Sequence, residues 1–225
     1  DSKIENNNAI SKELESMAKT IYDYWFLQFE FPDKASKPYK SNGGKMVWNN
    51  QLKQAIPEGW KVLRLKDILI ENPKSKIKVN EVKNEGDFPF FTSGEKILRT
   101  NSYIVSGLNC YLNTGGNAGV KYFDGKSAYS TDTWCITASS GMNYLLPFIL
   151  KSIEPSMNDR FFQGTGLKHL QKDLLREYKI VIPSNDIINK FVNIVHQYFA
   201  KETIKFHENQ ELQSLRDFLL PMLMN

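Results

Sequence analysis

Residues 9–32 read AISKELESMAKTIYDYWFLQFEFP, and this stretch decides the organisation of the N-terminal part of the chain. Apolar side chains recur in it at spacings of four and three residues, which is the heptad pattern of a helix that packs along another helix. They are Ile10, Leu14, Met17, Ile21 and Tyr24. Proline lacks the amide hydrogen that continues the helical ladder, so Pro32 ends the pattern. We therefore expect an amphipathic helix over residues 9–30, followed by a polar connector to Lys45.

A second long helix is expected at the other end of the chain, from Ser184 to Leu220, where Pro221 closes it. Its apolar positions form two seams of different phase. The first seam is Ile188, Phe191, Val195 and Tyr198, and the second is Leu212, Leu215, Leu219 and Met222. Roughly 36 helical residues make a rod of about 54 Å, which is longer than one small domain can cover. We expect the rod to pack against the first helix, to bridge to other chains, or to do both.

The block between these helices, residues 45–183, has a different character. Short runs of β-branched and aromatic residues alternate there with clusters of Gly, Asn, Pro and Ser, which is typical of strands joined by tight turns. The expected strands are Trp60–Leu65, Phe88–Thr92, Ser102–Val105, Cys110–Asn113, Gly119–Phe123, Thr133–Thr137 and Tyr178–Ile182, with helices over 143–153 and 168–176. The predicted class is α+β: a strand-rich domain over 45–183, flanked by a helix and strap over 1–44 and a helix over 184–225.

Charge is distributed unevenly along the chain, although the net charge is only +4. Residues 1–44 hold 6 basic and 7 acidic side chains, and residues 184–225 hold 4 and 5. The central block holds 19 basic and 13 acidic side chains, so it carries the whole basic excess. This distribution favours a polyanion-binding module on a neutral scaffold, but an excess of this size is also common in ordinary domains.

The sequence disfavours membrane and secreted classes. No apolar run approaches the roughly 18 residues of a membrane span, and residues 1–10 lack the basic and apolar regions of a signal peptide. We therefore expect a cytoplasmic protein, in which Cys110 and Cys135 stay as free, buried or half-buried thiols.

Motifs of catalysis are missing as well. The chain has no G-x-x-x-x-G-K-[ST] loop, no G-x-S-x-G elbow and no H-E-x-x-H pair. His169, His196 and His207 are scattered through predicted helices, and neither they nor the two cysteines have the spacing of a metal site. We expect no catalytic residue, no metal and no cofactor bound by this chain.

Four polar loops of the central block are the candidate binding site. Three glycines in 113–119 let backbone amides approach a ligand closely, although the same composition suits a plain hairpin turn. Asp132 is suited to accept a hydrogen bond from cytosine N4, and Thr165 with Lys168 could hold a phosphate at the start of the expected 168–176 helix. The candidates are Thr92, Ser93, Lys96, Asn113, Thr114, Gly115, Gly116, Asn117, Ser130, Thr131, Asp132, Thr133, Arg160, Gln163, Thr165, Gly166 and Lys168. We expect Phe161 and Phe162 in the core.

Three segments together resemble one half of a specificity subunit of type I restriction–modification enzymes. The first comprises Ile21–Pro32 (IYDYWFLQFEFP), Lys37–Lys40 (KPYK) and Gly43–Asn49 (GGKMVWN). The second is Ile56–Trp60 (IPEGW) with Leu65–Ile68 (LKDI), and the third runs from Gly164-x-Gly166-Leu167 through Leu174 to Ile180–Pro183 (IVIP). The first segment is the most specific, and the three in this order cover nearly the whole chain.

The resemblance implies a function. Such subunits catalyse nothing; each target-recognition domain takes one half of a bipartite DNA site, and the helices form an antiparallel rod between the domains. The implied partners are double-stranded DNA, methyltransferase subunits and a motor-nuclease subunit, and S-adenosylmethionine, ATP and magnesium are then expected on those partner subunits only. The helix seams named above would supply the contact surface.

This chain departs from the family pattern because it has one recognition domain where two are usual. That implies either a half-subunit that forms a homodimer or a fragment of a longer chain, and both interpretations stay open. A homodimer would be two-fold symmetric and would read an interrupted palindrome.

Two other functions are compatible with the residues. A protein–protein adaptor would use the heptad seams and the modest charge without binding DNA. A stand-alone enzyme would have to bring Asp132 and His169 together, which their sequence spacing cannot establish.

Overall fold

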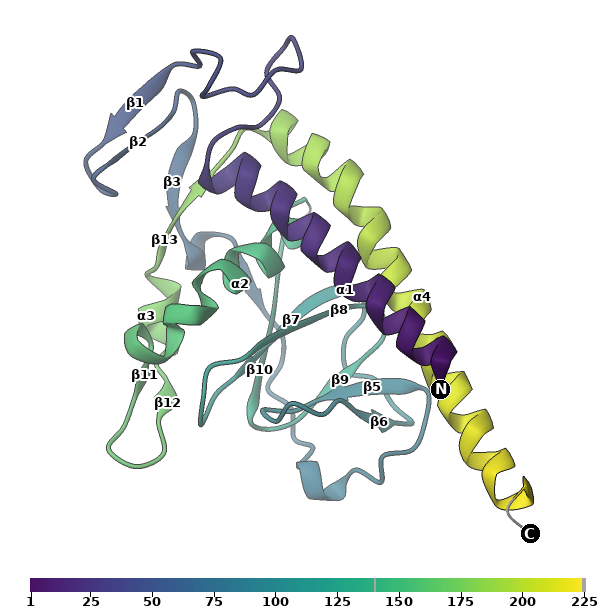
Figure 1. The fold of residues 1–225 in the computed structure, drawn as a ribbon. Helices are drawn as coiled ribbons and strands as arrows, with labels where there is room; N and C mark the ends of the chain where they lie inside the picture. Colours follow the sequence, from purple (N-terminus) through teal and green to yellow (C-terminus); the bar gives the residue numbers. More distant parts are fainter. Residues whose placement is uncertain (140, 224–225) are drawn as a thin grey trace.

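Two long helices lie side by side along one flank of a strand-rich domain (Figure 1). The computed structural model describes residues 1–139 and 141–223. The strands occupy the chain between Met46 and Ile182, and the two helices precede and follow them, which confirms the predicted α+β class. The domain boundaries at residues 44 and 183 stay predictions. Within the described ranges, none of the helices is long and apolar enough to span a membrane.

The N-terminal helix α1 spans Ser2–Tyr22 and continues as a π-helical turn over Asp23–Leu27. The Gln28 amide donates to the Asp23 carbonyl at 3.0 Å, the i→i+5 bond of a π turn, and Phe29 then adopts a left-handed backbone with φ of 65°. The helix therefore begins before the predicted residue 9 and ends before residue 30. The prediction that Pro32 ends the helix is wrong, because the π-helical turn and the left-handed backbone of Phe29 end it earlier in the sequence.

The buried face of α1 differs from the predicted heptad seam. Its buried residues are Asn7, Ala18 and Tyr22. In the predicted seam, Leu14 and Ile21 are half-buried and Ile10, Met17 and Tyr24 are exposed. The physical reason is that α1 packs against α4 and also reaches the domain, where Glu15 accepts a hydrogen bond from Tyr122 at 2.8 Å. Two neighbours, not one partner helix, set the buried face.

The C-terminal helix α4 spans Asn185–Leu223 and runs antiparallel to α1, with Tyr22 beside Phe191 and Asn7 beside Asn209. Pro221 lies inside the last turn of α4, so the prediction that the helix ends at Leu220 is wrong.

The first predicted seam of α4 is confirmed as buried: Ile188, Phe191, Val195 and Tyr198. The second is not, because α4 extends past the start of α1, where Arg216 pairs with Asp1 at 3.2 Å (Figure 1). The domain reaches this part of α4 through polar contacts such as that of Arg99 with Ser214 at 3.2 Å, which leave the apolar side chains accessible. In that seam Leu212 is half-buried and Leu215, Leu219 and Met222 are exposed.

The largest sheet has four antiparallel strands in the order β4–β10–β7–β8. Their bounds are Leu69–Glu71, Thr133–Ala138, Leu108–Asn113 and Val120–Asp124. Every residue of β7 is buried, since helix α2 (Met142–Arg160) packs on the sheet and the Phe91 ring stacks on Tyr111 at 3.9 Å. Phe91 belongs to a second sheet of order β6–β5–β9, with bounds Leu98–Thr100, Phe88–Phe91 and Ala128–Tyr129. Cys110 and Cys135 are free and buried in the large sheet, as predicted.

Three two-stranded pairs complete the domain. β1 (Met46–Asn49) and β2 (Gln54–Pro57) form a hairpin, β3 (Lys61–Arg64) pairs with β13 (Lys179–Ile182), and β11 (Phe162–Gln163) pairs with β12 (His169–Leu170). The short helices are η2 (Leu65–Asp67), η3 (Val79–Glu81) and α3 (Lys172–Arg176).

Two further predictions from the sequence are wrong. The segment 102–105 forms only an isolated bridge from Val105 to Ser127, not a strand. The helix predicted over 168–176 is reduced to α3, because His169 and Leu170 are hydrogen-bonded to β11.

A polar clasp of side-chain hydrogen bonds joins the N-terminal part of α1 to the C-terminal half of α4. The side chain of Asn7 is 1% exposed, and its amide donates to Glu208 at 3.1 Å and to Asn209 at 2.8 Å. Asn209 donates in turn to Asn8 at 2.9 Å, and Lys3 pairs with Glu208 at 2.6 Å. The clasp satisfies an amide that would otherwise be buried without a partner.

A second polar cluster lies where both helices meet strand β8. The Tyr122 hydroxyl lies 2.8 Å from the Tyr198 hydroxyl and donates to Glu15 at 2.8 Å. Next to them, one carboxylate oxygen of Glu202 is buried and has no hydrogen-bond partner among the described residues. Burial raises the pKa of Glu202 above its usual value, and the nearby Glu15 carboxylate acts in the same direction.

The cluster predicts a pH-dependent gain of stability for Glu202→Gln. Because the pKa of Glu202 is higher in the folded state, its ionised form destabilises the fold above that pKa. This cost disappears below the pKa of about 4.5 in the unfolded chain. Removing the charge should raise the free energy of unfolding by about 1 kcal/mol at pH 7, and the gain should shrink as the pH approaches 4.5.

Urea unfolding at pH 7 and pH 5 measures this difference. Glu211→Gln, at an exposed position of the same helix, is the matched control and should change stability little at either pH. A Glu202→Gln variant that is less stable than the parent at pH 7 would contradict the prediction.

Candidate nucleic-acid interface

The four predicted loops meet at one end of the large sheet. The carbonyl of Asp132 accepts hydrogen bonds from the Ser93 hydroxyl, from the Thr114 amide at 3.2 Å and from the Thr114 hydroxyl at 2.8 Å. The Gly116 amide donates to the Lys168 carbonyl at 2.9 Å. These bonds link the loops at 93, 114–116, 132 and 168 into one continuous surface, which sequence spacing alone could not establish.

Four of the candidate side chains lie beneath this surface, in the interior of the domain. Thr92, Asn113, Ser130 and Thr133 are all buried. The hydroxyls of Ser130 and Thr133 lie 3.0 Å apart, and Thr133 also donates to the Phe91 carbonyl at 3.3 Å. Asn113 donates to the Asn117 carbonyl at 3.0 Å. In this structure the side chains of these four residues hold the loops in shape through hydrogen bonds within the protein.

Most of the remaining candidates are accessible to solvent. Exposed residues are Lys96, Asn117, Asp132, Gln163, Thr165, Gly166 and Lys168, and half-buried ones are Ser93, Thr114, Gly115, Gly116 and Thr131. The Ser93 and Thr114 hydroxyls and the Gly116 amide are already used in the bonds between the loops. Arg160 is the outlier, because its guanidinium lies over the rings of Tyr178 at 4.9 Å and Phe161 at 5.3 Å. Arg160 therefore braces the base of the β11–β12 hairpin.

The hairpin β11–β12 projects from the domain on the side away from the C-terminal half of α4 (Figure 1). Lys168 lies in this hairpin and not at a helix N-terminus, so the predicted phosphate site on a helix end is wrong. The same hairpin turn leads into a strand, and it lacks the strand–turn–helix geometry of a dinucleotide-binding loop. Phe161 and Phe162 are buried at its base, as predicted.

A groove beside these loops contains charged residues that sequence analysis missed. Lys121 from β8 donates to the Thr92 carbonyl at 2.9 Å, and Lys151 and Glu154 from α2 pair at 2.9 Å in the same groove. Burial lowers the pKa of Lys121, and the neighbouring Lys151 lowers it further. The sequence held no indication of this cluster, because its members lie on elements that only the fold brings together.

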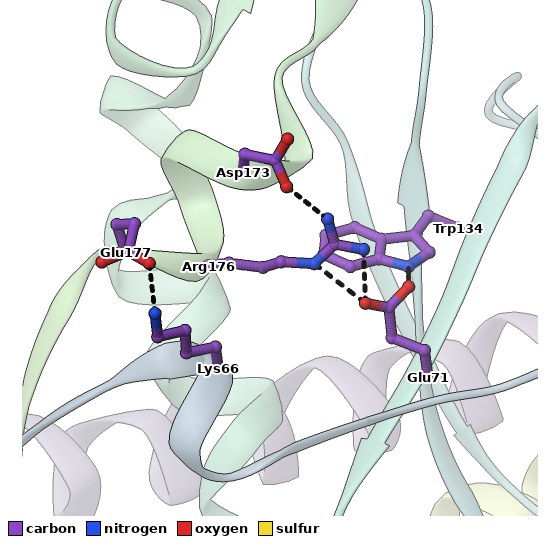
Figure 2. Close-up of polar contacts among 6 residues, drawn as sticks. All are labelled: Lys66, Glu71, Trp134, Asp173, Arg176 and Glu177. Atoms are coloured by element: carbon purple, nitrogen blue, oxygen red, sulfur yellow. Dashed lines mark hydrogen bonds and ion pairs between the residues drawn. The ribbon is translucent and has the colours of Figure 1, made fainter.

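An ionic network anchors α3 to the sheet next to the loops (Figure 2). Glu71 at the end of β4 accepts hydrogen bonds from the Trp134 indole at 2.8 Å and from Arg176 Nε at 2.9 Å. The guanidinium of Arg176 also pairs with Asp173 at 2.6 Å and lies 5.4 Å from the Trp134 ring. Burial raises the pKa of Glu71, but the hydrogen bonds from Arg176 and Trp134 outweigh it, so the net pKa lies below the usual value.

The geometry gives no support to a catalytic pair. Asp132 and His169 lie on neighbouring segments, but in the described ranges no hydrogen bond or ion pair joins their side chains. The described residues also contain no group of three His, Cys, Asp or Glu side chains that could hold a metal ion.

Comparison with known proteins identifies the family. The model of the type I restriction modification DNA specificity domain matches residues 57–214. The chain belongs to this family. It is 27% identical, over 99% of its length, to the MjaIX specificity subunit of Methanocaldococcus jannaschii, and 22% identical, over 76% of its length, to the EcoDI specificity subunit of Escherichia coli.

A solved structure shares the fold of this family member. The type I restriction–modification S subunit from M. genitalium superposes with a TM-score of 0.62 at 17% identity, over 98% of this chain and 56% of that one. The chain spans 55% of the M. jannaschii subunit and 39% of the E. coli subunit, so it corresponds to about half of such a protein or less.

The network in Figure 2 predicts that Glu71 is a structural anchor of the site. Replacing Glu71 with alanine removes the acceptor of the Trp134 indole, which is 3% exposed, and the main partner of Arg176. We expect the free energy of unfolding to fall by about 1–2 kcal/mol, measured by urea denaturation. Asp173→Ala is the control, because this aspartate is 93% exposed and its ion pair should contribute less than about 0.5 kcal/mol. Equal losses in the two variants would contradict the assignment.

Proposed function

We propose that this chain is the DNA-reading subunit of a type I restriction–modification complex and reads one half of a bipartite site. The observation that carries the proposal is the convergence of four polar loops into one surface at the end of the sheet. Family membership supports it, since the matching family model is that of a DNA specificity domain. The basic excess of the central block supplies the charge that a DNA surface needs.

In this proposal, buried residues keep the loops in shape and exposed residues contact the DNA. Buried Ser130 and Thr133 keep the backbone of one loop fixed, and exposed Asn117, Asp132 and Gln163 offer amide and carboxylate groups that match base edges. Exposed Lys96 and Lys168 would meet phosphates at the margin of such a contact. Because the loops are already held in one conformation and end in short polar side chains, they would lose little conformational entropy on binding.

The chain itself would be non-catalytic. Methyltransferase subunits would bind S-adenosylmethionine and modify DNA, and ATP and magnesium would belong to a motor-nuclease subunit. The helices would dock the partner subunits, because α1 and the π-helical turn that follows it present Ile10, Met17 and Tyr24 to solvent at intervals of seven residues. The exposed end of α4 would meet a second copy of the chain or the other half of a longer one.

The DNA proposal predicts two kinds of variant. Lys168→Ala should weaken binding to every duplex alike, because a phosphate contact carries no sequence information. Asn117→Ala and Gln163→Ala should each remove hydrogen bonds to a base and lower the preference for the cognate duplex by about 1–3 kcal/mol. Asn50→Ala is the control, since Asn50 is an exposed asparagine in the β1–β2 turn and belongs to none of the four loops.

Competition binding tests this, with the chain assembled with methyltransferase subunits from its source organism. The cognate duplex is taken from the interrupted adenine-methylation motif that disappears when the gene is deleted. Equal affinity of the parent protein for cognate and scrambled duplexes would overturn the proposal and favour the adaptor.

The docking proposal predicts that Ile10, Met17 and Tyr24 can be changed to serine without loss of the fold. Because these side chains are exposed, the melting temperature should stay within about 3 °C of the parent value. The mass of the assembly with methyltransferase subunits, measured by light scattering, should fall. Glu13→Ala with Thr20→Ala changes exposed polar positions of the same helix and should leave the mass unchanged.

A further inference from the structure

A strip of lysines runs beside the loop surface, on a segment that sequence analysis did not single out. Lys74, Lys76 and Lys78 are exposed, while Ser75 between them is buried and Ile77 is half-buried. This alternation of exposed and buried residues is typical of an extended segment with its lysines on the solvent side, and Lys78 itself has extended dihedrals of φ −84° and ψ 150°. No ion pair involves these lysines in the described ranges, so their charge is available to a partner.

The strip is held rigidly against the core. The Thr131 amide donates to the Ile77 carbonyl at 3.0 Å, and the Tyr129 hydroxyl donates to the Pro73 carbonyl at 2.5 Å. The Asn72 amide donates to the Cys135 carbonyl at 3.1 Å. Each of these bonds ties the segment to β9, β10 or the loop between them. The lysine stems therefore project from a fixed backbone and not from a mobile loop.

The same bonds place the strip directly beside the base-reading candidates. Thr131, which bonds to Ile77, belongs to the loop of Asp132. On the other side the strip approaches α3: burial lowers the pKa of Lys172, Glu71 opposes this, and Arg176 and Lys74 lower it further. Lys74 at one end of the strip is therefore near Lys172, whose ammonium lies 4.9 Å over the Trp134 ring.

We infer that Lys74, Lys76 and Lys78 form a track for the phosphate backbone of the DNA whose bases the adjoining loops read. The inference rests on the proposed function and adds a separate element to it, a sequence-independent anchor. Alternate residues of an extended chain are about 6.6 Å apart, so the strip spans about 13 Å. One strand of B-DNA carries a phosphate per about 3.4 Å of axis, so each lysine can meet a different phosphate.

The test compares salt dependence with sequence preference. Lys74, Lys76 and Lys78 are changed together to glutamine in the chain assembled with methyltransferase subunits, and binding to cognate and scrambled duplexes of equal length is measured between 50 and 200 mM salt. The slope of log affinity against log salt is negative, and each lysine that no longer neutralises a phosphate should reduce its magnitude by about 0.9. The magnitude of the slope should therefore decrease by about 2–3 on both duplexes. The ratio of the two affinities should change less than about twofold.

The matched control changes Lys34, Lys37 and Lys40 to glutamine. These exposed lysines of the strap carry the same charge at the opposite end of the molecule from the loops (Figure 1), and their removal should leave the slope unchanged. A second control, arginine at positions 74, 76 and 78, should keep the parent slope.

The outcomes separate the two proposals. A parent-like slope in the glutamine variant, or an equal drop in the strap control, would overturn the phosphate track even if the parent protein prefers the cognate duplex. A parent protein without preference would overturn the reading of bases, whereas the slope on scrambled DNA would still decide whether the strip binds phosphate.

Discussion

The packing of Phe191 is the constraint on which the rest of the structure depends. This ring is fully buried at the crossing of three helices, where its centroid lies 4.9 Å from Phe26, 5.5 Å from Phe148 and 6.2 Å from Tyr22. Phe26 lies in the π turn that ends α1, Phe148 lies on α2, and Phe191 itself lies on α4. Burying one such ring contributes about 1.5–3 kcal/mol, and its edge-to-face contacts add to that. The junction thus fixes both scaffold helices to the helix that covers the sheet.

A continuous chain of packed and hydrogen-bonded elements connects this junction to the loops. α2 packs on β7, β7 pairs with β10 and β8, and the loops that leave these strands carry the candidate contacts. Glu154 of α2 even accepts a hydrogen bond from the Val120 amide at 2.8 Å, next to the glycine-rich loop. The position of the loops relative to the helices is therefore set by packed elements throughout. The proposed reading of DNA would need this rigidity, because a displacement of the helices would move every loop together.

Sequence analysis predicted the elements whose residues form long periodic patterns. The two flanking helices, the buried seam from Ile188 to Tyr198 and six of the seven predicted strands were anticipated, because each is specified by local hydrophobic spacing. Short strands such as β1, β2, β11 and β12 were not predicted. The errors fall where tertiary contacts override local preference. The π turn ended α1 before Pro32, and pairing with β11 drew His169 and Leu170 out of the expected helix. Pro221 was accommodated within a last turn of α4.

For the candidate site, sequence indicated which loops to consider but not which side chains are free. Thr133 and Asp132 are adjacent and both can form hydrogen bonds, yet Thr133 is buried in a hydrogen-bond network and Asp132 is exposed. That distinction depends on Phe91, which is distant in sequence. Lys74, Lys76 and Lys78 escaped notice for the same reason, since only the fold places them beside the loop of Asp132.

The polar clasp around Asn7 has a consequence for the register of the two long helices. A slip of α1 by one turn against α4 would shift the pair by about 5.4 Å and would leave the buried amide of Asn7 without its acceptors, at a cost of about 1–3 kcal/mol. Apolar seams alone would tolerate such a slip far more readily, since Leu and Ile side chains fit several registers. The buried amide therefore favours a single register of α1 against α4, and any structure attached at the two ends of this helix pair is kept at a constant separation.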